Sequence, residues 1–225
     1  MQECNCNNHD KNSQTCNCPR LGEFAPDFEA ETTHGKIKFS EFNNGHWVIL
    51  FSHPADFTPV CTTEFIGFAQ KQQEFEKRNV KLLGLSIDSV YSHIAWIRQI
   101  EEDFELKINF PVIADLRFEV SSLYNMVHPA ISNTHAIRTV YIIDPEGVLK
   151  MFIAYPSSVG RNIDEIIRIV DALQIVDKKG VATPANWKPG ENVIIPPPKT
   201  KDEAEKRVHE KHEECKSWYL CKEKP

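Results

Sequence analysis

The cysteines are the residues of this sequence with the most distinctive chemistry. There are seven among 225 residues, an odd number, so at least one thiol has no partner within the chain. Cys61 stands alone between an N-terminal group and a C-terminal pair. The first residues lack the apolar segment of a secretory signal, so we expect a cytoplasmic protein. In such a protein, cysteines are more often reactive or metal-bound than structural.

The segment around Cys61 has the features of a nucleophile site. An apolar strand is predicted to end at Ser52, a loop with two prolines follows, and Cys61 begins a predicted helix. A helix N-terminus carries unpaired N–H groups and a partial positive charge, which favour a thiolate over a thiol. Thr58 lies one turn earlier, where its hydroxyl can bond the sulfur or a substrate oxygen, and Pro54 stiffens the loop and shields the site. The alternative is a buried, inert cysteine.

Alternating apolar runs indicate the elements that position this segment. Runs rich in β-branched residues, typical of buried strands, lie at 47–52, 80–87, 110–114, 138–144 and 148–155. The last two are joined by turn residues at 144–147. Apolar residues at helical spacing predict helices over 62–77, 89–104 and 163–176. Strands that alternate with helices and finish in a hairpin indicate an α/β fold with a mixed sheet.

The composition changes along the chain in a way that predicts three segments. Residues 1–20 are rich in Cys and Asn and read as a tail, and residues 21–177 carry the α/β pattern. In the extension, 178–225, a proline-rich strap precedes a charged stretch that reads as a solvated helix with an aromatic cluster near its end. We expect that cluster, which includes Trp218 and Tyr219, to dock on another surface.

Charge and hydropathy exclude two classes of partner. The formal net charge is −6, which argues against nucleic-acid binding, because that needs a basic surface. No stretch approaches the ~20 consecutive apolar residues that span a bilayer, so we expect no membrane association.

The spacing Pro54-x-x-x-Thr58-x-x-Cys61 resembles the active-site motif of peroxiredoxins. Residues 51–64 (FSHPADFTPVCTTE), 137–144 (IRTVYIID), 155–162 (YPSSVGRN) and the strap resemble the one-Cys subfamily. The resemblance covers about residues 21–198. It implies a thioredoxin-like fold with helices on both faces of the sheet, and thiol-dependent reduction of hydrogen peroxide and organic hydroperoxides without a cofactor. It also implies a homodimer or a ring of dimers.

The resemblance assigns roles by motif position. Cys61 would be the peroxidatic nucleophile, oxidised to a sulfenic acid, and Pro54 would belong to the same catalytic motif. Thr58 and Arg138 would bind the peroxide and polarise its O–O bond. Donors aimed at oxygens where charge develops are what this chemistry needs.

A supporting shell is implied at His53, Glu64 and Arg161. Two of these have simpler alternatives. A histidine at a strand end is often only a satisfied polar group. Arg161 precedes a predicted helix, where an ion pair with Glu64 or Asp164 would also account for it.

Cys215 and Cys221 depart from the one-Cys pattern and resemble the paired C-terminal cysteines of archaeal-type thioredoxin peroxidases in the same subfamily. That resemblance implies that one of them, Cys221 by preference, resolves the Cys61 sulfenic acid as a disulfide, which in the family joins two subunits. A thioredoxin-like dithiol would then be the reductant. A local Cys215–Cys221 disulfide, or two idle thiols, remain alternatives.

The N-terminal pairs Cys4-x-Cys6 and Cys16-x-Cys18 lie outside the family pattern. Four thiolates could hold zinc or another soft metal, but the spacing is tighter than usual, and incidental thiols are the alternative. The pattern around Cys61 also fits a peroxide sensor or redox-switched holdase without sustained turnover. A Cys–His hydrolase using Cys61 and His53 explains less. His46 stands where animal relatives carry a lipase serine, so no lipase activity is expected.

Overall fold

The computed structural model describes residues 18–210 and 213–225. The predictions about Cys4, Cys6 and Cys16 therefore lie outside the described residues. The chain forms two compact units, Met1–Arg161 and Asn162–Pro225, and each is described here by itself. This division groups the helix that begins at Ile163 with the C-terminal unit, whereas the sequence pattern placed it with the preceding α/β body.

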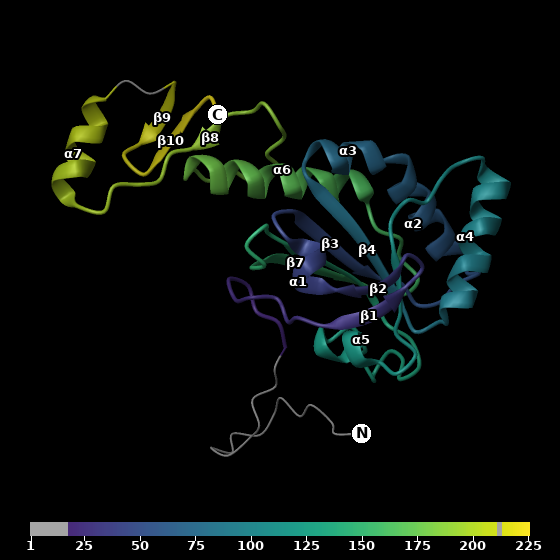
Figure 1. Cartoon of the computed structure of the whole chain (residues 1–225). Coiled ribbons are helices and arrows are strands. Elements are labelled where there is room, and N and C mark those ends of the chain that lie inside the picture. Colours follow the sequence, from purple (N-terminus) through teal and green to yellow (C-terminus); the bar gives the residue numbers. More distant parts are fainter. Residues whose placement is uncertain (1–17, 211–212) are drawn as a thin grey trace, which may run out of the picture. The chain divides into compact units, whose positions relative to one another are not determined.

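The first unit is built on a seven-stranded sheet in the order β2-β1-β5-β4-β3-β6-β7 (Figure 1). The strands are β1 Glu29–Thr32, β2 Gly35–Lys38, β3 Trp47–Ser52, β4 Val80–Ser86, β5 Val112–Ala114, β6 Arg138–Ile143 and β7 Leu149–Tyr155. β3, β4 and β5 are parallel, while β6 is antiparallel to β3 and to β7, and β1 is antiparallel to β5. The predicted mixed sheet is confirmed.

Helices cover both faces of this sheet. They are α1 Phe39–Asn43, α2 Pro59–Gln70, α3 Gln72–Lys77, α4 Val90–Phe104 and α5 Glu119–Leu123. Val48 and Leu50 of β3 belong to the apolar core that includes residues of α1 and α5. Phe51, one residue further on, stacks on Phe68 of α2 with ring centroids 4.2 Å apart. Successive side chains of a strand point to opposite faces, so the two helical layers lie on opposite sides, as predicted.

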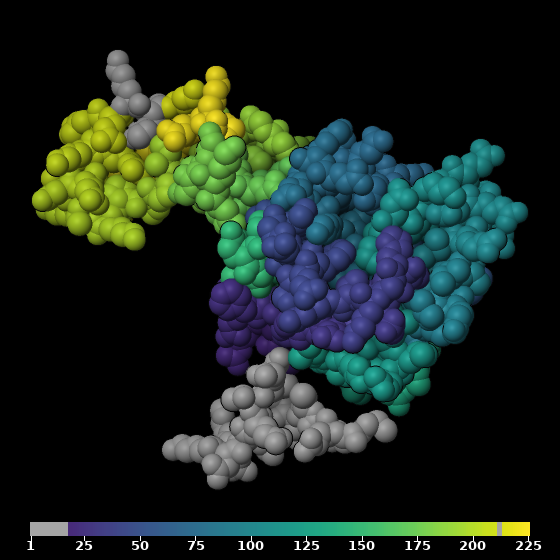
Figure 2. All heavy atoms as spheres, in the orientation of Figure 1, coloured from purple at the N-terminus to yellow at the C-terminus, as the bar shows by residue number. Residues whose placement is uncertain are grey.

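Two features of this unit differ from the sequence prediction. The helix predicted over 62–77 begins earlier, because Pro59 occupies a first-turn position, where its missing N–H costs nothing. It is also divided into α2 and α3 at Lys71, whose backbone leaves the helical region. β1, β2, α1 and α5 have five residues or fewer and were not predicted, since so few residues carry little periodicity. In Figure 2 residues 18–38, which include the β1–β2 hairpin and are drawn in purple to dark blue, lie on the visible face of this unit.

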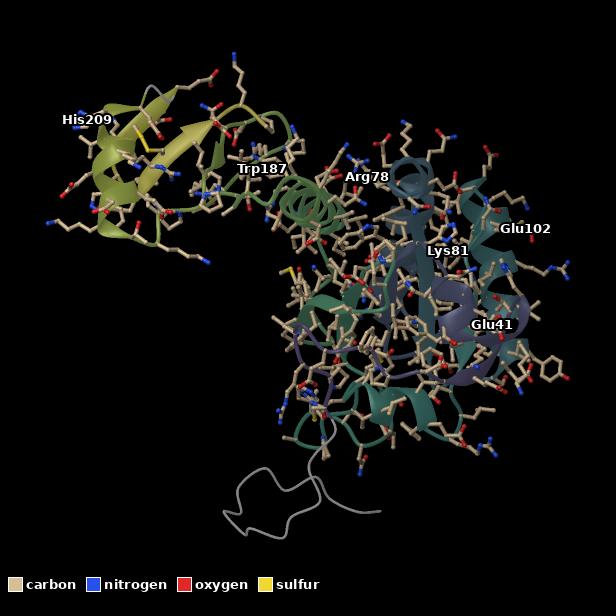
Figure 3. The ribbon with its side chains drawn as sticks, turned by 60° about the vertical axis from the view of Figure 1, so that its left-hand side comes forward. Glu41, Arg78, Lys81, Glu102, Trp187 and His209 are labelled. Atoms are coloured by element: carbon tan, nitrogen blue, oxygen red, sulfur yellow. A yellow bond between two sulfur atoms is a disulfide. The ribbon has the colours of Figure 1, made fainter. Side chains whose placement is uncertain are left out.

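The C-terminal unit contains two helices and a small sheet. α6 spans Ile163–Lys179 and α7 spans Lys201–His209, and the sheet has the order β8-β10-β9, with β8 Val193–Ile194, β9 Glu214–Ser217 and β10 Leu220–Glu223. The prediction of a solvated helix is confirmed for α7 and wrong beyond it, where a hairpin places Cys215 opposite Cys221. Trp187 of the strap (Figure 3) is anchored by its indole N–H, which donates to the Glu191 carbonyl at 3.0 Å.

No helix within residues 18–210 and 213–225 is long and apolar enough to cross a membrane.

Candidate active site

Cys61 is the third residue of α2 and is buried, with 0% of its surface exposed. The loop between β3 and α2 contains Pro54 and ends at Thr58. Thr58 is the N-cap residue of α2, and its backbone is extended. The Thr58 hydroxyl makes no capping bond and donates instead to the Ala55 carbonyl at 2.8 Å. The Thr58 hydroxyl proton is therefore used in a hydrogen bond within the loop. The role of Thr58 in substrate binding stays a prediction.

Arg138 is a charged group in direct contact with the Cys61 sulfur. It begins β6, and its Nη1 donates to Cys61 Sγ at 3.3 Å. Its Nε and Nη2 both donate to the Ser157 carbonyl, at 2.9 and 2.8 Å. The carbonyl fixes one edge of the planar guanidinium, so the other edge faces the sulfur. A fixed positive charge at this distance favours the thiolate over the thiol.

Glu64 lies one turn after Cys61 on α2 and joins two arginines. Its Oε2 accepts from Arg138 Nη1 at 2.6 Å and from Arg161 Nη2 at 2.7 Å, and its Oε1 accepts from Arg161 Nε at 2.8 Å. The three side chains are nearly fully buried. The structure therefore brings together four of the residues predicted from sequence, Cys61, Glu64, Arg138 and Arg161. The simpler alternative for Arg161, an ion pair with Glu64, also holds.

The electrostatics of this cluster follow from its composition. Burial alone would raise the pKa of Glu64, but the charges and hydrogen bonds of Arg161 and Arg138 outweigh it and hold that pKa below its usual range. Glu64 is therefore ionised at neutral pH. Two guanidinium charges against one carboxylate leave one net positive charge beside the sulfur, which suits chemistry that passes through an anionic nucleophile and an anionic leaving group.

His53 follows β3 directly and its side chain is fully buried. Its Nε2 lies 2.9 Å from Asp56 Oδ1, and its ring packs against those of Phe65 and Trp96. The alternative that His53 is a satisfied polar group holds for Nε2 but not for Nδ1, which has no hydrogen-bond partner.

Asp56 and His93 belong to this region, and neither was predicted from the sequence. His93 of α4 places Nδ1 2.8 Å from Asp56 Oδ2, and both residues are buried. The available signals were a carboxylate in a mainly apolar loop and a histidine on the predicted buried face of α4. Within the described residues, one group of side chains has the spacing of metal ligands. It consists of His53, Asp56 and His93, whose potential ligand atoms lie within 4.8 Å of one another. Hydrogen bonds join the Asp56 carboxylate to both histidine rings.

Cys215 and Cys221 are joined to each other as a disulfide across the β9–β10 hairpin (Figure 3). This is the local pairing that the sequence left open as an alternative to a resolving role. Cys221 is buried. Cys18, the described member of the N-terminal cysteines, is partly buried and lies outside the disulfide.

Comparisons with known proteins agree with this geometry. Residues 21–152 match the AhpC/TSA family, and residues 172–211 match the C-terminal domain of 1-Cys peroxiredoxin. The chain is 54% identical over 216 residues to a peroxiredoxin of Aquifex aeolicus, covering 92% of this chain and 97% of that one. It is 53% identical over 214 residues to a peroxiredoxin of Methanosarcina mazei, with 92% and 98% covered.

Two solved structures show the same fold. One is the yeast mitochondrial 1-Cys peroxiredoxin, with a TM-score of 0.80 and 44% identity, covering 92% of this chain and 99% of the other. The second is a cysteine-to-serine mutant of peroxiredoxin 6 of Arenicola marina, with a TM-score of 0.81 and 38% identity, covering 92% and 98%. The thioredoxin-like fold and the enzyme class, thiol-dependent peroxide reduction, follow from these relatives. The chain is a member of the peroxiredoxin family.

Proposed function

We propose that Cys61 is the peroxidatic nucleophile of this peroxidase. The observation that carries the proposal is the Arg138 Nη1–Cys61 Sγ contact of 3.3 Å in a buried site. The sulfur attacks one peroxide oxygen, the O–O bond breaks, and the bonding electron pair leaves on the second oxygen as an alkoxide or hydroxide that takes up a proton. The products are a Cys61 sulfenic acid and an alcohol or water.

Arg138 acts on both partners of this step. Its guanidinium favours the thiolate, and it can donate to a peroxide oxygen on which negative charge grows as the O–O bond breaks. Glu64 and the Ser157 carbonyl hold it in place through the bonds given above. Arg161 acts through Glu64 and is a positioning residue. Thr58 offers its oxygen to the peroxide, and Pro54 removes an N–H and shields the site from water.

We place the resolving step on the C-terminal hairpin. A Cys221 thiolate attacks the Cys61 sulfenic sulfur, the S–O bond breaks and hydroxide leaves and takes up a proton from solvent to become water, and a Cys61–Cys221 disulfide forms. Cys215 lies opposite Cys221, so its thiolate can then attack the Cys221 sulfur and release Cys61 as a thiolate, which leaves a Cys215–Cys221 disulfide. The pairing of these two cysteines with each other supports this order. Cys61 is 0% exposed, so the first turn of α2 must open before any second thiol reaches it.

The reductant and the assembly complete the proposal. A disulfide product needs two electrons, which a thioredoxin-like dithiol supplies by exchange. In the yeast mitochondrial relative, thiol resolution proceeds via glutathione and thioredoxin systems. We propose a homodimer in which the hairpin of one subunit serves Cys61 of the other. A disulfide reduced at every turnover fits a reducing compartment such as the cytoplasm.

The test of the nucleophile is steady-state consumption of hydrogen peroxide with dithiothreitol. Cys61→Ser should abolish turnover, and Cys18→Ser is the matched control, since Cys18 is a described cysteine outside the disulfide. Many turnovers in the unmodified protein and in Cys18→Ser, with none in Cys61→Ser, support a peroxidase with Cys61 as its nucleophile. A stoichiometric reaction that then stops would instead indicate a peroxide sensor or holdase.

The test of the resolving step is a mass map of the disulfides formed after one equivalent of peroxide on the fully reduced protein. We expect Cys215→Ser to accumulate a Cys61–Cys221 disulfide and Cys221→Ser to stop at oxidised Cys61. A Cys61 that never enters a disulfide in either variant would remove the hairpin from the cycle.

A further inference from the structure

The disulfide between Cys215 and Cys221 joins two sulfurs whose surroundings differ. Cys215 is exposed, whereas Cys221 has 0% of its surface exposed. The two residues lie opposite each other across the β9–β10 hairpin. A thiolate can open a disulfide by attacking either sulfur, and the access to each sulfur is one of the factors that selects between them. The difference in burial therefore bears on where a reductant attacks.

The strand order of the small sheet explains this difference. In the order β8-β10-β9, Cys221 lies on the central strand and Cys215 lies on an edge strand (Figure 1). β10 has a neighbour on each side, and Ile195, directly after β8, donates its backbone N–H to the Cys221 carbonyl at 3.0 Å. Within the described residues, β9 pairs with β10 alone, so the outer side of β9 is open.

The direction of thiol attack favours the same sulfur. An attacking thiolate approaches in line with the S–S bond, from the side opposite the sulfur that leaves. Because this bond joins β10 to β9, attack on Cys215 comes from beyond the open edge of β9. Attack on Cys221 would have to come from the side of β8, where Val193 is also 0% exposed. A thiolate could therefore reach Cys221 only after the small sheet had opened.

The surroundings of Cys221 suit it as the sulfur that leaves. Its Sγ lies 3.4 Å from the Ser217 carbonyl oxygen, which can accept a hydrogen bond from the S–H group of a reduced Cys221. Burial favours the neutral thiol over the thiolate. Cys221 can therefore be released and protonated while it keeps its place in the hairpin.

The size of the reductant makes this difference matter. Of the three cysteines in the proposed cycle, Cys215 is the one with an exposed side chain, because Cys61 and Cys221 are each 0% exposed. A small dithiol needs only a brief local opening to reach a buried sulfur. A protein dithiol carries its thiol on a folded surface and needs a sulfur that is already exposed.

We propose that Cys215 is the sulfur that a protein dithiol of the thioredoxin type attacks. The place of this step in a catalytic cycle rests on the proposed function, whereas the attack itself needs only the Cys215–Cys221 disulfide. The reductant thiolate bonds to Cys215 Sγ, the Cys215–Cys221 bond breaks, and Cys221 leaves with the electron pair and takes up a proton. The second thiolate of the reductant then attacks the reductant sulfur bound to Cys215, and Cys215 leaves as a thiolate that is protonated in turn. The reductant ends as a disulfide and the hairpin as two thiols.

The direct test traps the first step on the variant Cys61→Ser. This protein is oxidised with diamide, its remaining thiols are blocked with N-ethylmaleimide, and it is mixed with a thioredoxin whose second active-site cysteine is replaced by serine. Early samples are quenched in acid and digested with trypsin, whose cleavage after Lys216 separates the two cysteines for mass spectrometry. We expect thioredoxin on Cys215 to exceed thioredoxin on Cys221 by about tenfold or more. Equal amounts, or an excess on Cys221, overturn the proposal. Because Cys61 is absent, this test can fail while Cys61 remains the nucleophile of the unmodified protein.

Trapping with glutathione separates the effect of the fold from that of the local sequence. The same oxidised and blocked protein is treated with glutathione once in buffer and once in urea. We expect glutathione chiefly on Cys215 in the folded protein and on both cysteines in the unfolded protein, where the strand order no longer protects Cys221. A preference for Cys215 that is the same in both conditions overturns the argument from the small sheet.

The variant Cys215→Ser tests the consequence for the choice of reductant. Its Cys61–Cys221 disulfide would lack an exposed sulfur, so we expect turnover with thioredoxin and thioredoxin reductase to fall on the order of tenfold more than turnover with dithiothreitol. Cys18→Ser, outside the disulfide, is the matched control. An equal fall with both reductants overturns the proposal.

Discussion

Glu64 and Asp56 are two buried carboxylates in the same unit, and each accepts hydrogen bonds from two cationic or titratable side chains. The partners of Glu64 are Arg138 and Arg161, and those of Asp56 are His53 and His93. An arginine stays charged at every accessible pH, whereas a histidine can release its proton near neutrality.

The difference shows how one site can separate two tasks. The arginine cluster supplies a permanent positive field at the Cys61 sulfur, with Arg138 Nη1 3.3 Å away. The histidine cluster is built from side chains of a type that can gain or lose a proton near neutrality. Each cluster is centred on a carboxylate, but we expect only the histidine cluster to make the rate of Cys61 oxidation depend on pH.

Removing each carboxylate is the strongest way to test this comparison. Glu64→Gln leaves two buried guanidinium charges that cannot neutralise, so we expect it to lower the free energy of unfolding by about 3–5 kcal/mol. Asp56→Asn should cost less, because histidine side chains, unlike arginines, can be neutral near pH 7. Urea unfolding at neutral pH measures both. An Asp56→Asn loss equal to or larger than that of Glu64→Gln would break the comparison.

Arg138 should show the next largest effect, and we expect it chiefly in the rate of Cys61 oxidation. Arg138→Met removes the donor that faces the sulfur, and we expect a loss on the order of 100- to 1,000-fold in the rate constant for Cys61 oxidation. Arg138→Lys keeps the charge but not the planar fork, so it should recover only part of the rate. Stopped-flow fluorescence with hydrogen peroxide gives both constants, and an unimpaired Arg138→Met would remove Arg138 from the reaction.

The two clusters should also lose stability in different pH windows. Burial lowers the pKa of His53 below its ordinary value of 6.5, so the unfolded chain binds a proton that the folded chain does not, and stability falls as the pH drops below about 6.5. The pKa of Glu64 lies below 4.5, so its contribution is present above that pH and is lost only as the pH falls further.

Urea midpoints measured from about pH 7 to about pH 4 check these windows. His53→Gln should flatten the first descent, between about pH 6.5 and about pH 5, by less than the loss expected for Glu64→Gln. A first descent that survives unchanged in His53→Gln would assign it to another group.

The smallest effect is expected from Ser92→Ala. It removes one of the donors to Asp56 and leaves both histidines in place. We expect a loss of about 0.5–1.5 kcal/mol in the free energy of unfolding and little change in the pH profile of Cys61 oxidation. A loss equal to that of Asp56→Asn would mean that this hydrogen bond, and not the contacts with the two histidines, carries the contribution of Asp56 to stability.

The elements that the sequence predicted well are those with a long, regular apolar pattern. β3 has the predicted bounds, because six successive buried residues leave little ambiguity. α4 ends at Phe104 as predicted and begins one residue later than predicted, at Val90, because Ser89 is its N-cap. The hairpin of β9 and β10 was missed because its residues are charged, and pairing across the strands, not periodicity, defines it.

The residues of the candidate site also fall into a group that the sequence predicted and a group that it did not. Cys61, Thr58 and Arg138 were identified through a motif that the family resemblance supplied, and Glu64 and Arg161 came with it. Asp56 and His93 lie 37 residues apart and belong to no motif recognised in the sequence. Their contact depends on the parallel pairing of β3 with β4, which brings the loop after β3 and the start of α4 to the same edge of the sheet.

The most direct test of the central claim is to find where the first oxidation falls. The reduced double variant Cys215→Ser/Cys221→Ser, treated with one equivalent of hydrogen peroxide and a sulfenic-acid trap, should carry the label on Cys61 by peptide mass spectrometry. The same protein with Arg138→Met should carry far less label at the same time point. A label on Cys18 with Cys61 unmodified, or equal labelling of Cys61 with and without Arg138, would contradict the account.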